Sequence, residues 1–294
     1  MSKKLVYFML LISVVFLWGL SFPLMKLTLY YISPVLLLST RFLLSAALMV
    51  PLVFKNKKLF EKNNIVIGVI GGILLFLAYY FQTVGLKYTT PSQSGLITGT
   101  YIILLPLISL LYVKLKINKI DVFAVLLGFA GLFLMSSFKI SPQYAFGDIL
   151  TFICAIFYAF QTVYVYKYTK FLDSLVFTFY QLLIVGVLSS LFLPFHVSFS
   201  GLHVPIVIFT VVFTAVFAGL YSYLINTRAL MYIEPTAAGV VYVGEPVFAV
   251  ITSIFIINEI PTVYTVIGGI IIVIAMFIET FHKYVESKGS FKVD

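Results

Sequence analysis

The chain has 294 residues, of which 62% are hydrophobic and only 10% are charged. Soluble domains carry about 45–50% apolar and roughly 25% charged residues, so this composition excludes a soluble enzyme, a nucleic-acid binder and a disordered protein. It predicts an integral membrane protein. The formal charge of +9 comes from basic residues that lie between apolar runs, which indicates membrane topology and no nucleic-acid partner. The single cysteine, Cys154, excludes an intramolecular disulfide and a cysteine-cluster metal site, and we expect no metal and no cofactor.

About 20 apolar residues span the hydrocarbon core of a bilayer, so the long charge-free runs predict helices that cross it. The sequence predicts ten such helices and an all-α fold, with these limits: 5–26, 32–54, 65–87, 92–114, 120–138, 146–167, 174–195, 204–226, 235–258 and 261–281. Arg41 interrupts the second helix and Glu245 interrupts the ninth. The first stretch is too long for a signal peptide and lacks a small-residue cleavage site, so we expect an uncleaved helix.

The basic residues predict the orientation of the helices. If the N-terminus is cytoplasmic, 15 of the 19 Lys and Arg residues fall in cytoplasmic segments. Three, Lys26, Lys87 and Lys139, fall in outer segments, and Arg41 lies within a helix. Because cytoplasmic loops are enriched in Lys and Arg, both termini are predicted to lie in the cytoplasm, with the protein in the cell membrane.

The two halves of the sequence match each other in part. A shift of 140 residues aligns Trp18 with Tyr158, Arg41 with Gln181, Pro106 with Pro246, Asn118 with Asn258 and Gly128 with Gly268. In the third and fourth helices the shift is 144, and it aligns Tyr79 with Tyr223, Gln82 with Asn226 and Pro91 with Pro235. The change of shift predicts four extra residues in the first copy, between Pro91 and Pro106.

The match predicts two five-helix repeats, at 5–138 and 146–281, followed by a cytoplasmic tail at 282–294. Since five is odd, two copies in series must have opposite orientations in the membrane. Inverted repeats of this kind are the architecture of alternating-access transporters, with the substrate site between the repeats near the bilayer midplane.

Several short motifs accompany the duplication. They are Trp18-Gly19-Leu20-Ser21-Phe22 with Lys26, Arg41-Phe42, Gly95-Leu96-Ile97-Thr98-Gly99 with Leu105-Pro106, and Gly244-Glu245-Pro246-Val247-Phe248 with Asn258-Glu259. With them the chain resembles the EamA-type family of the drug/metabolite transporter superfamily over about residues 5–282. The resemblance implies ten helices arranged as 5+5 and a plasma-membrane carrier of small metabolites, often an exporter. One departure is Asn118-Lys119, where members often have Gly-Glu, which weakens any role for an acid there.

Six helices each carry an aromatic or polar pair at positions i and i+3, which lie on one helix face. The pairs, each followed by its copy, are Trp18 and Ser21 with Tyr158 and Gln161, Tyr79 and Gln82 with Tyr223 and Asn226, and Thr98 and Tyr101 with Tyr242 and Glu245. Polar side chains within a membrane collect toward a bundle interior or a wet cavity. We predict that these twelve residues line one substrate-binding cavity. Hydrogen bonds that only hold the helices together, or interfacial anchoring of the aromatic residues, are the alternatives.

Two prolines lie mid-helix at positions that the shift makes equivalent, Pro106 and Pro246. A proline removes one backbone hydrogen bond, and matched interruptions indicate a transport site. We therefore predict kinks that gate the cavity or shape the bundle. Arg41 and its partner Gln181 are predicted to be structural polar residues. Lys26 is predicted to reach the lipid headgroups, with contact to an anionic substrate as the alternative.

Glu245 lies about ten residues into its helix, roughly 15 Å deep by helical rise. Burial at that depth favours the neutral acid. Three roles remain open from sequence: a proton carrier, a cavity residue without coupling, and a structural acid that bonds backbone freed by Pro246 or pairs with Arg41.

These features predict a secondary transporter of small organic metabolites, with export as the favoured direction. A cavity rich in aromatic residues suits neutral, zwitterionic or amphipathic solutes such as amino acids, driven by a proton gradient or by a counter-gradient of substrate. A channel or scramblase and a membrane-embedded enzyme are the alternatives, and the sequence has no clustered His or acidic residues that would favour the enzyme. It also has no GxxxxGK[ST] loop, which excludes a site for direct ATP coupling. The expected partners are the solute and membrane lipids.

Glycines in the fifth and tenth helices are predicted to pack against neighbouring helices or a second subunit, in a monomer or homodimer. They include Gly128, Gly131, Gly268 and Gly269.

Overall fold

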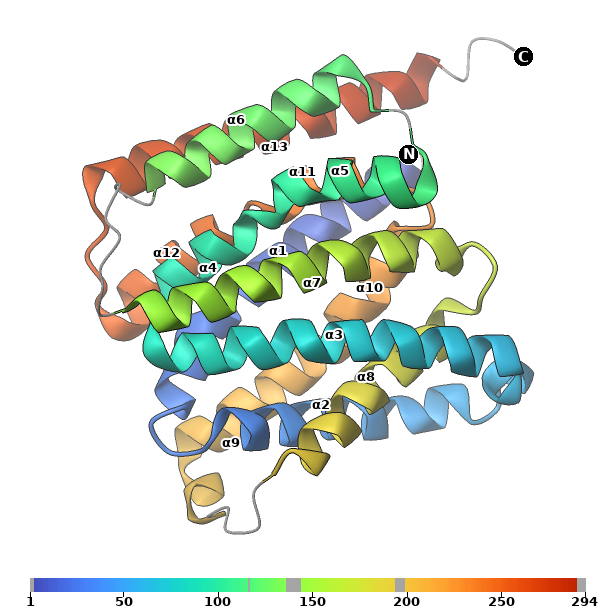
Figure 1. Cartoon of the computed structure of the whole chain (residues 1–294), viewed down its shortest axis with the longest axis vertical. Coiled ribbons are helices and arrows are strands. Elements are labelled where there is room, and N and C mark those ends of the chain that lie inside the picture. Colours follow the sequence, from blue (N-terminus) through green and yellow to red (C-terminus); the bar gives the residue numbers. More distant parts are fainter. Residues whose placement is uncertain (1–2, 116, 136–143, 194–198, 290–294) are drawn as a thin grey trace.

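The computed structural model describes residues 3–115, 117–135, 144–193 and 199–289, and in these ranges all regular structure is helical (Figure 1). Lys139 and part of the connection between the predicted helices at 174–195 and 204–226 lie outside the described residues. In chain order the elements are α1 (Lys3–Thr28), α2 (Pro34–Val53), η1 (Lys57–Phe60), α3 (Lys62–Tyr88), α4 (Pro91–Gly99), α5 (Tyr101–Val113), α6 (Lys119–Met135), α7 (Ala145–Thr169), α8 (Ser174–Leu191), η3 (Ser200–His203), α9 (Pro205–Phe213), the π-helical η4 (Thr214–Tyr221), α10 (Ser222–Ala229), α11 (Pro235–Tyr242), α12 (Glu245–Ile257) and α13 (Val263–Gly289).

The predicted all-α membrane fold is confirmed. Within the described residues, nine stretches are long and apolar enough to cross a membrane, and three of these combine shorter elements: α4 with α5, α9 with η4 and α10, and α11 with α12. The remaining helix, α6, has 17 described residues and corresponds to the predicted span at 120–138. The count of ten crossings and the division into two repeats stay predictions.

Local sequence signals explain where several helices begin. The Ser33 side chain accepts a hydrogen bond from the Leu36 N–H at the start of α2, and Asp173 caps α8 in the same way through Leu175 and Val176. Side-chain oxygens at these positions satisfy backbone donors that the first helical turn leaves unpaired. Ser33 and Asp173 are also aligned by the 140-residue shift.

The fourth and ninth predicted helices are each interrupted, at Thr100 and at Val243–Gly244. These breaks differ from the kinks predicted at Pro106 and Pro246, and the predicted equivalence of the two prolines is wrong. Pro246 lies in the first turn of α12, where a missing N–H costs little, whereas Pro106 lies inside α5.

The ends of these two helices show the correct alignment. Lys114 and Asn258 both adopt the left-handed conformation, with φ of 56° and 55°, and their N–H groups bond to the carbonyls of Ser109 and Ser253. Each pair is separated by 144 residues, as are the starts of α4 and α11. The 144-residue shift therefore continues through both helices, and the four extra residues predicted between Pro91 and Pro106 are not there.

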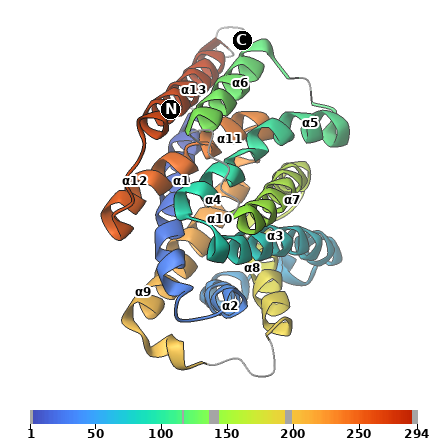
Figure 2. The same cartoon turned by 60° about the vertical axis from the view of Figure 1, so that its left-hand side comes forward.

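The packing of the helices has matched counterparts in the two halves of the chain. Helix α1 packs on α12, as α7 packs on α4 and α5. Helix α3 packs on α8, as the crossing formed by α9, η4 and α10 packs on α2 (Figures 1 and 2). Helix α1 begins and α13 ends at the same end of the bundle, where the connections from α2 to α3 and from α7 to α8 also lie (Figure 1).

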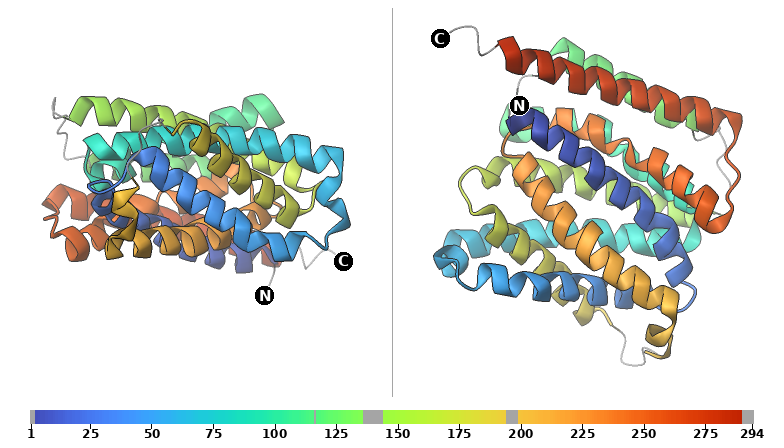
Figure 3. Two further views of the ribbon diagram at one scale, coloured as in Figure 1. Left: turned by 90° about the horizontal axis from the view of Figure 1, so that it is seen from below. Right: turned by 180° about the vertical axis from the view of Figure 1, so that it is seen from behind.

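Helices α6 and α13 lie side by side as an outer pair, which Figure 3 shows from behind. Two glycines let them approach closely, because a Cβ atom on Gly131 would lie 2.8 Å from the Gly268 carbonyl oxygen. These helices also carry polar side chains. Asp121 and Glu279 are buried in them, and Asn118 Nδ2 lies 3.3 Å from His282 Nε2.

We expect Gly268→Ala to destabilise the protein by about 1–3 kcal/mol, because the added methyl group would collide with the Gly131 carbonyl and the Met135 side chain. Thermal unfolding, followed by loss of the monodisperse gel-filtration peak, measures the change. Gly269→Ala is the matched control, since its Cβ would meet only ordinary contacts at 3.8 Å and beyond. Equal stability of the two variants would contradict close packing of α6 on α13.

We expect positions 58 and 260 to lie on opposite sides of the membrane, with 58 in the cytoplasm. Lys58 is exposed in η1, and Ile260 is 90% exposed between α12 and α13. Single cysteines placed there on a Cys154→Ser background are tested with an impermeant thiol reagent on intact cells. Labelling at 260 with protection at 58 is the expected result, and the reverse pattern would overturn the predicted orientation.

Candidate functional site: a central polar cavity

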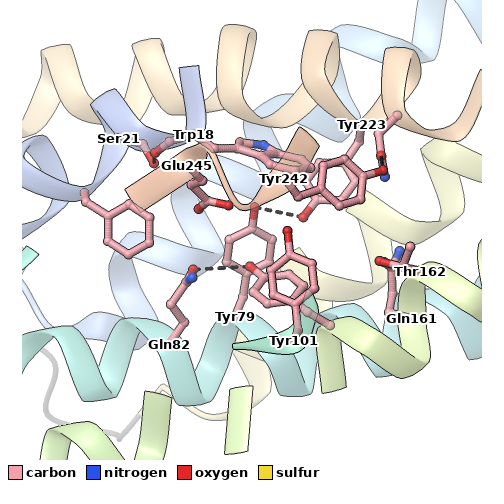
Figure 4. A pocket seen from close by; sticks show the side chains of 13 residues that line it. Trp18, Ser21, Tyr79, Gln82, Tyr101, Gln161, Thr162, Tyr223, Tyr242 and Glu245 are labelled. Atoms are coloured by element: carbon pink, nitrogen blue, oxygen red, sulfur yellow. Dashed lines mark hydrogen bonds between the residues drawn. The ribbon is translucent and has the colours of Figure 1, made fainter. Parts of the chain in front are cut away.

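Residues from both halves of the chain surround a cavity of about 30 Å³ in the middle of the bundle (Figure 4). Eleven of the twelve residues predicted to line it do so. The lining residues are Trp18, Ser21, Phe22, Tyr79, Gln82, Tyr101, Tyr158, Gln161, Thr162, Tyr223, Asn226, Tyr242 and Glu245. A cavity of this size holds one or two water molecules. Their role in substrate binding stays a prediction.

The twelfth predicted residue, Thr98, lies behind the cavity wall. Its hydroxyl accepts a hydrogen bond of 3.3 Å from Gln82 Nε2, so it orients a lining side chain. The sequence pattern missed Phe22 and Thr162, each of which directly follows a predicted residue. A strict i, i+3 pattern selects too narrow a stripe, because the face that a helix presents to a cavity also includes neighbouring positions.

Tyrosine hydroxyls connect the two halves across the cavity. Tyr223 donates to the Tyr79 hydroxyl at 2.9 Å, and these two residues are aligned by the 144-residue shift. Tyr158 donates to Gln82 Oε1 at 3.2 Å, which also joins the halves, whereas the bond that Tyr242 donates to Asn226 Oδ1 lies within the second half. The lining residues therefore also form the interhelical hydrogen bonds that were the alternative prediction, so the two interpretations hold together.

The π-helical segment η4 holds one wall of the cavity in place. Wider π-helical turns change which carbonyls are available to partners outside the helix. The Trp18 indole N–H donates to the Ala218 carbonyl at 3.0 Å, and Ser45 donates to the Ala215 carbonyl at 2.8 Å. The Trp18 ring lies 5.6 Å from the Tyr223 ring and 5.9 Å from the Tyr242 ring, between centroids.

Glu245 is the eleventh of the 23 residues in the crossing Pro235–Ile257, and its side chain is 7% exposed. Among the residues that the structure describes, its carboxylate has no hydrogen-bond or ion-pair partner. A structural acid was expected to bond backbone freed by Pro246 or to pair with Arg41. Neither interaction is formed. Figure 4 shows the carboxylate directed into the cavity from the side of Trp18, opposite Gln82.

Arg41 and Gln181 lie outside the cavity, and their structural roles stay predictions. The Arg41 Nη1 donates to Met25 Sδ at 2.7 Å. Its guanidinium carbon lies 4.6 Å from the Phe42 ring centre and 4.8 Å from the Tyr79 ring centre, so it stacks behind the cavity wall. Gln181 is fully buried, and its amide has no hydrogen-bond partner among the described residues.

Lys26 does not reach toward the cavity. Its ammonium group donates to the carbonyls of Leu86, Lys87 and Thr89 at 2.8, 3.1 and 2.6 Å. These carbonyls belong to the C-terminal end of α3, where backbone acceptors are unpaired and a positive charge is favourable. Lys26 therefore caps α3, which differs from the predicted contact with headgroups or substrate.

Apolar helices long enough to span a membrane surround a buried polar cavity, an arrangement that membrane transporters share. Within the described residues, no group of His, Cys, Asp and Glu is arranged to hold a metal ion. The sequence profile of the EamA-like transporter family matches residues 5–137 and 145–281. The chain belongs to this family.

Its relatives carry transporter names as well. An "Uncharacterized transporter" of Archaeoglobus fulgidus is 30% identical over 265 residues, which cover 90% of this chain and 82% of the relative. The "Uncharacterized transporter YyaM" of Bacillus subtilis is 30% identical over 292 residues, which cover 92% of each chain. A solved structure titled "Crystal structure of protein" matches with a TM-score of 0.73 at 18% identity, over 94% of this chain and 96% of that one, and supports the fold alone.

We expect Gln82→Ala and Asn226→Ala each to lower transport efficiency about five- to tenfold, because each removes the partner of a tyrosine hydroxyl in the cavity wall, a bond worth about 0.5–1.5 kcal/mol. Efflux of a radiolabelled solute from proteoliposomes measures the effect, with gel filtration to verify folding. Asn63→Ala, at an exposed position in α3, is the control. Unchanged kinetics in both cavity variants would assign these residues a purely structural role.

Proposed function

We propose that this protein is a secondary transporter that exports small organic metabolites from the cell by alternating access at the central cavity. The two units of the carrier are the inverted repeats at 5–138 and 146–281. The protein lies in the plasma membrane with both termini in the cytoplasm. A proton gradient or a counter-gradient of solute supplies the driving force, and the solute class expected from sequence comprises neutral, zwitterionic and amphipathic compounds, amino acids among them.

The observation that carries this proposal is a polar cavity at mid-crossing whose walls come from both halves of the chain. Its volume of about 30 Å³ is far below that of a metabolite, so a solute enters only when the halves move apart. The breaks at Thr100 and at Val243–Gly244 lie next to Tyr101 and Glu245 in the cavity wall, and discontinuous helices at the binding site are typical of carriers with inverted repeats.

Counterflow in proteoliposomes tests the carrier mechanism. We expect an excess of unlabelled solute inside the vesicles to accelerate uptake of the labelled solute, with saturation, because the two share one site that faces each side in turn. The same vesicles with an imposed pH gradient measure any coupling to protons. Flux that neither saturates nor responds to solute on the opposite side would indicate a channel and contradict the proposal.

A further inference from the structure

We infer that the solute of this cavity is a small organic cation, a primary or quaternary amine without a carboxylate. The binding of this cation is inferred from the structure alone. Its transport across the membrane rests on the function proposed above. The inference retains the amphipathic solutes expected from sequence and replaces the neutral and zwitterionic ones, amino acids included, with cations.

The first observation is the aromatic character of the wall. Trp18 and five tyrosines surround the cavity, with neighbouring ring centroids between 5.5 and 6.4 Å apart. The faces of aromatic rings attract cations, most strongly where water is excluded, and cages of such rings recognise ammonium groups. The Tyr79 ring already binds one cation in this way, since the Arg41 guanidinium stacks against it from outside the cavity.

The second observation is the direction of the hydrogen bonds. The hydroxyl protons of Tyr158, Tyr223 and Tyr242 are donated to neighbouring side chains. The Ser21 hydroxyl donates to the Trp18 carbonyl at 2.6 Å, and the Trp18 indole donates to Ala218. These donors are already used, whereas the hydroxyl lone pairs remain. These hydroxyl lone pairs and the surrounding rings form an electronegative part of the wall that suits a cation, beside the donors that remain on Tyr101 and the Asn226 amide.

The third observation is the charge of the wall. Glu245 is the one acidic residue among the described lining residues, and no Lys or Arg lies with it. Burial alone favours its neutral form, and a cation in the cavity would favour the carboxylate. A buried carboxylate without a partner is unfavourable, and an ammonium group in the cavity would provide the missing partner. A carboxylate in the solute would instead face Glu245. The buried Gln161 Nε2, which has no partner among the described residues, offers it only a neutral donor.

Trp18 is the single tryptophan of the chain and lies in the cavity wall, so its fluorescence reports binding directly in detergent micelles. The probes are phenethylamine, phenylalanine and phenylacetate, which share a ring and differ in their charged groups, with choline as a second cation. We expect phenethylamine to give a saturable change, phenylalanine to bind at least about tenfold more weakly, and phenylacetate to give no saturable change. Tighter binding of phenylalanine or phenylacetate would overturn the inference, as would no response to either phenethylamine or choline.

The variant Glu245→Gln removes the counter-charge with little change of shape, and we expect it to weaken binding of phenethylamine at least about tenfold. Glu234→Gln, a half-buried acid at the start of α11 and outside the cavity, is the matched control with unchanged affinity. Wild-type affinity in a folded Glu245→Gln protein would overturn the inference; if that variant does not fold, the selectivity of the wild-type protein decides it.

The binding and counterflow experiments separate this inference from the proposed function. Amine binding without counterflow would refute the transport function and leave the cation site intact. Counterflow of phenylacetate but not of phenethylamine would refute the cationic solute and leave the transport function intact.

Discussion

The carboxylate of Glu245, at the middle of a membrane crossing, is the feature around which the polar interior of this protein is built. Placing a charged side chain at the centre of a helix in the membrane costs about 2.5–3.5 kcal/mol on insertion scales. The surrounding helices contribute hydroxyl, amide and aromatic groups at the same depth, and most of these groups hydrogen-bond to one another. The resulting interior is polar enough to hold an acid, and two of these hydrogen bonds, from Tyr158 to Gln82 and from Tyr223 to Tyr79, join the two halves of the chain.

The same physical cost explains why so much of the cavity could be predicted from sequence. In hydrocarbon, a polar side chain that recurs at helical spacing has few places to point except inward, so eleven of the twelve selected residues meet at one cavity. Thr98 was predicted to line the cavity because residue spacing shows which side chains share a helix face. Spacing does not show how the helix is rotated relative to the cavity, and Thr98 lies behind the wall. The capping role of Lys26 needed three-dimensional information, since its acceptors lie 60 to 63 residues away in sequence.

The helix breaks were harder to predict because proline is an ambiguous signal. Pro246 begins a helical segment and Pro106 remains inside one, so identical residues at a regular shift have different structural consequences. The left-handed residues Lys114 and Asn258 establish the alignment, and backbone dihedral angles of this kind are not visible in a comparison of residue types. The burial of Asp121 and Glu279 was not predicted either. Both acids lie on otherwise apolar helices, and the packing of α6 on α13 buries their side chains.

Some of the residues that the 140- and 144-residue shifts align lie at opposite ends of the bundle, polar at one end and apolar at the other. At one end, Asp148 accepts hydrogen bonds from Thr89 at 2.9 Å and from Gln93 at 3.1 Å, next to the carbonyls that Lys26 caps. The related positions at the other end are Phe8, Ile233 and Ala237, all buried in one apolar cluster.

Parting the polar contacts exchanges their hydrogen bonds for bonds to water, at a small net cost for each bond. Parting the apolar cluster exposes hydrophobic surface, at roughly 25 cal/mol for each Å² uncovered. The two ends are thus held by different interactions, so in the proposed carrier the two open states would not have equal free energies. That inequality arises from side chains remote from the cavity, and it can differ between proteins with identical binding residues. In the proposed carrier, the rate of the cycle and the apparent affinity at each face would therefore depend on residues other than those that select the solute, whereas the gradients set the net direction.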